Sequence, residues 1–335
     1  MNSKRMVWID LLKILACFLV IINHCIGNIF NFSKEINTTI FYCINFSLCK
    51  IAVPIFIMIT GALLLNKKSN YRDMLKKILR IIIPLLLLSY IIYIKNNDFN
   101  IINFVKSFLK EPVIYPYWYL YMLISLYLVT PFIQKMIANF NNKDFICFIL
   151  VCLIFPLVFE TSFKIFNYSI SNMFYICVFS KIIGIYVLGY FLSTCNIKKM
   201  YKNISIISFI MLMILYFLTF YIPYIKVGQI SYLFDNYDCL FAVIGGACIF
   251  YLFRYIFKKE NYKYSKIISI VSSCTFGIYL FHYLFINTIL RIDIIQLIFK
   301  CNLYLGIYLL EIIVFLVSFI ITYLLKQIPY IKKVL

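Results

Sequence analysis

Three ionisable side chains lie inside the first long hydrophobic stretch of the chain, which runs from Met6 to Phe30. These side chains are Asp10, Lys13 and His24. At about 100° of turn per residue, Lys13 and His24 fall within about 20° of each other on a helix, and Asp10 lies about 40° from His24. An ionisable group inside a membrane costs about 2.5–3.5 kcal/mol on insertion scales, so it usually serves a function. The spacing therefore predicts a polar stripe on one helix face, either functional or buried as a polar seam between helices.

The sequence holds two histidines, His24 and His282. A histidine near its reference pKa can accept a proton from an attacking hydroxyl, which makes it a typical general base. The alignment of His24 with Asp10 and Lys13 favours a catalytic role for His24. His282 lies in a second hydrophobic stretch, where a histidine can equally serve as an interhelical hydrogen-bond partner. For His282 both interpretations stay open.

Composition shows which elements must position these side chains. The chain has 335 residues, of which 64% are hydrophobic and 13% charged, with a mean hydropathy of +0.96. Soluble proteins are about 45–50% apolar and about 25% charged, so the sequence predicts an all-α, polytopic integral membrane protein. No connecting loop is long enough for a soluble domain, and we expect one membrane-embedded domain over residues 1–335. Ten membrane spans are predicted, at residues 7–29, 44–65, 79–95, 117–137, 145–160, 173–194, 203–223, 238–257, 268–290 and 303–325.

The basic residues predict the orientation of these spans. Of the 32 lysines and arginines, 21 fall in loops on one side of the membrane and nine on the other. Because basic residues collect in cytoplasmic loops, both termini are expected in the cytoplasm. Topology then explains most of the net charge of +20. The expected partners are anionic membrane lipids or a phosphate-rich cofactor at the inner face, and no nucleic acid. The twelve cysteines show no metal-ligand spacing, so neither a disulfide framework nor a metal site is expected.

Two further clusters have both a structural and a functional interpretation. Lys77 and Arg80 are three residues apart where the third span begins, on one helix face. They suit a polyanion such as the diphosphate of coenzyme A, although basic residues also gather there for topological reasons. In the second span, Pro54 precedes the small pair Thr60 and Gly61, which predicts a close helix approach.

Taken in order, these motifs resemble the acyltransferase-3 family of polytopic membrane acyltransferases. In this chain, the motif of the family's first span is resembled by Arg5, Ile9-Asp10, Leu12-Lys13, Ala16 and His24. The second resembles Pro54 to Gly61, and the family's cytoplasmic R-x-x-R resembles Lys77-Ile78-Leu79-Arg80. The fourth span and a late G-I-Y-L-x-H motif resemble Trp118 to Tyr121, Leu126 to Pro131, and Gly277 to His282. The resemblance covers the chain from Arg5 to the tenth span and is closest to the stand-alone branch that O-acetylates surface polysaccharides.

The resemblance implies a donor, an acceptor and site residues. The donor would be cytoplasmic acetyl-CoA or another acyl-CoA, and the acceptor a hydroxyl of a surface glycan or lipid-linked sugar. Arg5, Lys13, Lys77 and Arg80 would bind the acyl-CoA. Lys13 and Lys77 stand where many members of the family have arginine. His24 would act as general base or as a transient acyl carrier, with Asp10 orienting Lys13. Substrate binding is assigned to Trp118, Tyr119 and His282, and the expected location is the plasma membrane of a bacterium.

Two other functions fit parts of the pattern. A transporter or flippase of a glycan or lipid would also have ten spans and intramembrane charges, although no inverted repeat supports that function. The second alternative is the membrane half of a receptor-like or racemase-associated relative within the same family. Binding or consumption of acetyl-CoA by the purified protein would separate a transferase from a transporter.

Overall fold

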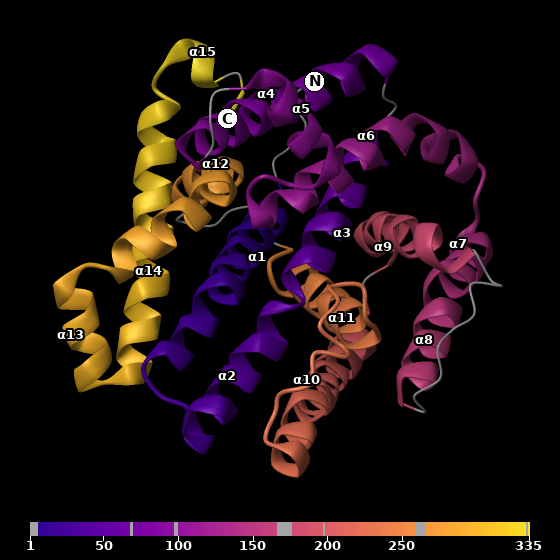
Figure 1. Ribbon diagram of the computed structural model, residues 1–335. Helices are drawn as coiled ribbons and strands as arrows, with labels where there is room; N and C mark the ends of the chain where they lie inside the picture. Colours follow the sequence, from indigo (N-terminus) through magenta and orange to yellow (C-terminus); the bar gives the residue numbers. More distant parts are fainter. Residues whose placement is uncertain are drawn as a thin grey trace. The chain divides into compact units, whose positions relative to one another are not determined.

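The structure, a computed structural model, describes residues 6–67, 70–96, 100–165, 176–196, 198–258, 265–332 and 334–335. Its helices follow one another along the chain without an intervening strand in these ranges (Figure 1). The α-helices are α1 (Val7–Cys25), α2 (Ile36–Cys49), α3 (Ala52–Leu64), α4 (Tyr71–Asn96), α5 (Ile101–Lys110), α6 (Trp118–Ile137), α7 (Asn142–Ile149), α8 (Phe155–Ile165), α9 (Ile176–Thr194), α10 (Lys199–Val227), α11 (Leu240–Ile256), α12 (Ser265–Leu290), α13 (Asp293–Cys301), α14 (Leu303–Leu325) and α15 (Pro329–Lys332). The short helices are η1 (Ile26–Asn31), η2 (Tyr115–Tyr117) and the π-helix η3 (Leu150–Ile154).

The predicted all-α membrane architecture is confirmed. Within the described ranges, eight helical stretches are long and apolar enough to cross a membrane. Two shorter apolar stretches, Lys181–Thr194 in α9 and Leu240–Ile256 in α11, coincide with the predicted sixth and eighth spans. The number of membrane spans, their bounds and the orientation of the termini stay predictions.

The chain divides into two compact units. The first comprises residues 1–66 and 140–319, and the second comprises residues 67–139 and 320–335. The prediction of a single membrane-embedded domain stays a prediction.

In the first unit, α1 is the central helix. It packs against α12, α3, α2 and α11. Apolar side chains on several of its faces are buried, among them Leu12, Ala16 and Ile21. A helix that is apolar on most faces is suited to a position surrounded by other helices. The polar stripe of α1 is therefore placed where other helices can supply partners.

Glycines allow α3 and α9 to approach each other closely. A Cβ atom added to Gly61 of α3 would clash with the carbonyl oxygen of Tyr186, and one added to Gly189 of α9 would clash with the backbone of Met58. Small residues permit such contact between membrane helices, because dispersion contacts rather than hydrophobic burial drive their association. The packing role predicted for the Thr60-Gly61 pair agrees with this contact.

The second predicted span differs from the structure in its start and its continuity. Helix α2 begins at Ile36 instead of residue 44, and a turn at Lys50 and Ile51 separates it from α3. Lys50 therefore lies at a break inside the long apolar stretch Ile36–Leu64. Within a membrane, backbone that leaves a helix must lie against protein or a watery cavity, since lipid offers no hydrogen bonds. The fifth span is also irregular, because the π-helix η3 precedes Pro156, which has no amide hydrogen.

In the second unit, α4 packs against α6 and contacts the amphipathic helix α5. Asn100 caps α5 by accepting a hydrogen bond from the Asn103 amide at 3.1 Å. The Tyr121 hydroxyl of α6 donates to the carbonyl of Phe108 at 2.9 Å, which joins α5 to α6. This unit carries the predicted Lys77, Arg80, Trp118 and Tyr119.

Candidate functional site

The polar stripe of α1 begins with a buried carboxylate. The side chain of Asp10 is 4% exposed, and the Ser272 hydroxyl of α12 donates a hydrogen bond of 2.6 Å to it. One turn further along α1, Lys13 is half-buried. A buried charge is tolerated when hydrogen bonds replace its hydration, so the Ser272 contact both satisfies Asp10 and joins α12 to α1. Sequence reasoning did not identify Ser272.

The far end of the stripe brings the two histidines together. His24 occupies the last turn of α1, and its ring centroid lies 5.4 Å from that of His282 in α12, with the planes tilted by 39°. The Tyr283 ring meets His24 edge-on at 5.5 Å. The two histidines predicted from separate stretches of sequence therefore form one site. The same packing of α1 against α12 that satisfies Asp10 also creates this pair.

The hydrogen bonds of His282 determine which of its nitrogens carries the proton. Nδ1 lies 2.6 Å from the carbonyl oxygen of Tyr279, one turn earlier in α12. A carbonyl only accepts, so Nδ1 is the donor and the neutral ring has its lone pair on Nε2. Nε2 is buried and has no hydrogen-bond partner among the described residues. Buried polar atoms in proteins usually have a hydrogen-bond partner, and the hydroxyl of a bound substrate could donate a hydrogen bond to Nε2.

A carboxyl group that sequence reasoning missed lies near the histidine pair. Glu311 of α14 is buried, and neither of its carboxyl oxygens has a hydrogen-bond partner in the part of the chain that the structure describes. It lies close enough to Cys25, the residue after His24, for an electrostatic interaction. The signal for Glu311 was present in the sequence, because it is an ionisable residue inside the predicted tenth span.

Aromatic contacts explain how α14 presents Glu311. Phe315, one turn after Glu311, meets Phe18 of α1 edge-on at 5.7 Å. Tyr308, three residues before Glu311, meets Phe41 of α2 at 5.5 Å. Glu311 therefore lies on the face of α14 that packs toward α1 and α2, since residues three and four apart share a helix face.

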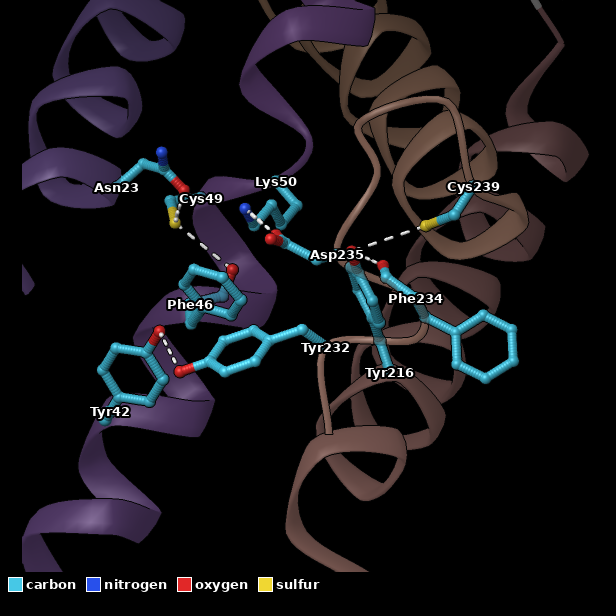
Figure 2. A network of polar contacts seen from close by, with 10 residues as sticks. All are labelled: Asn23, Tyr42, Phe46, Cys49, Lys50, Tyr216, Tyr232, Phe234, Asp235 and Cys239. Atoms are coloured by element: carbon cyan, nitrogen blue, oxygen red, sulfur yellow. Dashed lines mark hydrogen bonds and ion pairs between the residues drawn. The ribbon is translucent and has the colours of Figure 1, made fainter. Parts of the chain in front are cut away.

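The break between α2 and α3 contributes a cation to the same region. Lys50 forms an ion pair with Asp235, and its ammonium lies 4.0 Å from the centroid of the Phe46 ring. The neighbouring Cys49 thiol donates to the side-chain oxygen of Asn23 at 3.4 Å (Figure 2). Because Asn23 precedes His24, this contact places the helix break close to the His24 end of α1. Lys50 and Asp235 were not assigned to the site from sequence.

The remaining predicted residues lie in the second unit or outside the described residues. On α4, Lys77 is half-buried, Arg80 is exposed, and the two charges interact. At the start of α6, the Trp118 and Tyr119 rings meet edge-on with centroids 6.2 Å apart. The donor-binding role of Lys77 and Arg80 and the substrate-binding role of Trp118 and Tyr119 stay predictions. Arg5 lies outside the described residues.

Comparison with protein-family models gives one match. The acyltransferase-3 model, described as an acyltransferase domain, matches residues 6–328, which is almost the whole chain. No curated protein and no solved structure matches the chain.

Proposed function

Because this chain belongs to the acyltransferase-3 family and is therefore a membrane acyltransferase, we propose that it moves an acetyl group from acetyl-CoA to a sugar hydroxyl. The observation that supports this most directly is the His24–His282 pair beside Glu311 and Lys50. Acyl transfer to a hydroxyl needs a base for the hydroxyl proton and positive groups near the developing oxyanion. Histidine and lysine side chains meet these two needs.

In the proposed reaction, the hydroxyl oxygen of the acceptor attacks the thioester carbonyl carbon while His24 accepts the hydroxyl proton. The resulting tetrahedral intermediate collapses with cleavage of the carbon–sulfur bond. The departing thiolate of coenzyme A takes the proton back from His24, so the histidine is regenerated. Direct transfer is the simpler course, and a transient acyl-His24 is the alternative.

The neighbours of His24 have distinct proposed roles. The Nε2 lone pair of His282 is available to accept a hydrogen bond from an acceptor hydroxyl, since Nδ1 is engaged with Tyr279. Glu311 would stabilise the imidazolium that forms in the histidine pair during attack, because an opposite charge nearby favours a cationic imidazole. Asp10 and Lys13 lie about three to four turns earlier on α1, and we assign them to the donor end of the stripe.

The donor is proposed to bind from the cytoplasmic side. Lys77 and Arg80 share a face of α4 and are suited to the phosphates of coenzyme A. Lysine at position 77 has a compact ammonium instead of the planar guanidinium of arginine, so its hydrogen bonds to phosphate are less directional. The family resemblance also assigns Arg5 and Lys13 to the donor, and Trp118 and Tyr119 to substrate binding.

We place the protein in a bacterial plasma membrane with both termini in the cytoplasm, and its acceptor on a surface polysaccharide or a lipid-linked sugar. The test is mass spectrometry of cell-surface glycans with and without the gene. Loss of about 42 Da per site on deletion, the mass of an acetyl group replacing hydrogen, is expected. Restoration by the wild-type gene and not by a His24→Ala gene completes the test. Glycans identical in the two strains would overturn the proposal.

A purified preparation separates this function from transport. Protein in detergent should bind acetyl-CoA and release coenzyme A in the presence of an acceptor. A transporter or flippase would move a glycan across vesicles without consuming acetyl-CoA. Transport without thioester cleavage would therefore contradict the assignment.

A further inference from the structure

The segment between α10 and α11 is non-helical and carries side chains suited to a sugar. It begins at Gly228, whose positive φ of 76° ends α10, and it reaches Cys239, the N-cap of α11. Tyr232 is 52% exposed, and the Asp235 side chain is 40% exposed. Glycine tolerates the left-handed backbone at position 228 without a steric cost, which lets the chain turn back toward α2.

Two anchors hold this segment in place. The carbonyl of the buried Phe234 accepts a hydrogen bond of 2.9 Å from the Tyr216 hydroxyl (Figure 2). The Phe234 ring also meets Phe241 edge-on. Further along, Asp238 forms an ion pair of 2.7 Å with Lys181 of α9. The exposed Tyr232 and Asp235 are therefore carried by a segment whose neighbouring residues are fixed. A fixed loop can bind a ligand without a large ordering cost.

Tyr232 and Asp235 face the helix break beside the histidine pair. The Tyr232 hydroxyl lies 3.5 Å from that of Tyr42, and its ring meets Phe46 edge-on with centroids 5.9 Å apart (Figure 2). Asp235 pairs with Lys50, the cation that acts on His24. The cluster thus combines aromatic faces, phenol hydroxyls, a carboxylate and an ammonium in one place.

We propose that Tyr42, Phe46, Lys50, Tyr232 and Asp235 form the binding site for the sugar ring of the acceptor, an inference that rests on the proposed function. A sugar ring offers C–H faces that pack on aromatic rings and hydroxyls that donate to a carboxylate and accept from an ammonium. A pair of neighbouring hydroxyls can bridge Lys50 and Asp235, with both charges retaining hydrogen-bond partners. Because Cys49, next to Lys50, contacts Asn23, next to His24, a ring held here places a further hydroxyl near the proposed base.

Steady-state kinetics of the purified full-length protein test this site. The donor is acetyl-CoA, and the acceptor is surface polysaccharide from the deletion strain, chemically stripped of acetyl groups. Tyr232→Ala and Asp235→Asn should each raise the KM for polysaccharide about tenfold, the effect of losing about 1.4 kcal/mol of binding. The KM for acetyl-CoA and the thermal unfolding midpoint should stay at wild-type values. Asn236→Ala, at an exposed residue of the same segment that belongs neither to the proposed site nor to the two anchors, is the control and should leave the polysaccharide KM unchanged.

A charge reversal separates sugar binding from a purely structural ion pair. The double variant Lys50→Asp with Asp235→Lys restores an ion pair but exchanges the donor and acceptor offered to a sugar. We expect its polysaccharide KM to stay raised. A return to the wild-type KM, or a wild-type KM in both Tyr232→Ala and Asp235→Asn, would overturn the inference while leaving the transferase function intact. A wild-type protein that transfers no acetyl group would instead refute the proposed function itself.

Discussion

The His24 and His282 rings lie with centroids 5.4 Å apart, although they come from opposite ends of the chain. Their helices, α1 and α12, also share the hydrogen bond from Ser272 to Asp10. One helix contact therefore both satisfies a buried carboxylate and assembles the proposed catalytic pair. The following predictions test the parts of this arrangement.

Replacing His24 with alanine should lower acetyl transfer by about 10²–10⁴-fold, the usual contribution of a positioned acid–base group. The amount of protein in the membrane should not change, because His24 is not needed for the apolar packing of α1. Asn28→Ala is a suitable control, since Asn28 is a half-buried polar residue one turn further on that contacts the carbonyl of Cys25. Full activity of His24→Ala in a cell-surface acetylation assay would remove the catalytic assignment.

Replacing Glu311 with glutamine should lower kcat at least tenfold and leave both KM values unchanged. The amide is similar in shape but cannot stabilise a cationic imidazole by charge. The thermal unfolding midpoint should not fall, because the substitution removes a buried carboxyl that has no hydrogen-bond partner among the described residues. Glu35→Gln, at an exposed glutamate before α2, is the control. A normal kcat in Glu311→Gln would show that this carboxyl plays no part in the reaction.

Replacing both Lys77 and Arg80 with alanine should raise the KM for acetyl-CoA at least tenfold. The reason is the loss of two charged hydrogen-bond donors to phosphate, each of which contributes about 1.5–3 kcal/mol in favourable cases. Isothermal titration of purified protein with coenzyme A measures the same effect directly. A matched control removes Arg72 and Lys135, which are also exposed or partly exposed basic residues of the second unit. Equal weakening by the two double variants would show a general effect of charge and no specific site.

Replacing Gly61 or Gly189 with alanine should destabilise the protein by about 1–3 kcal/mol or more. Each new Cβ would meet backbone atoms of the facing helix, and backbone cannot move aside as a flexible side chain can. Thermal unfolding in detergent is the measurement. Gly27→Ala provides the comparison, because a Cβ there meets nothing within 4 Å. If all three variants unfold at the same temperature, the contact between α3 and α9 is looser than described.

The sequence by itself determined the class of fold and most helix positions. Long apolar runs in a chain with few charges leave helices as the spanning structure, since every backbone group must find an internal partner in lipid. It also identified Asp10, Lys13 and His24 as one helix face, because helical periodicity acts within a single segment. The small pair Thr60-Gly61 likewise predicted a close helix contact that the structure contains.

Contacts between distant segments were decided by the tertiary structure. Nothing local in the sequence joins His24 to His282, Ser272 to Asp10, or Lys50 to Asp235, because such pairs depend on which helices pack together and in what register. The break at Lys50 was likewise hidden, since its flanking residues are as apolar as those of a continuous helix. Periodicity within one segment thus revealed the polar stripe, and packing between segments supplied the groups that surround it.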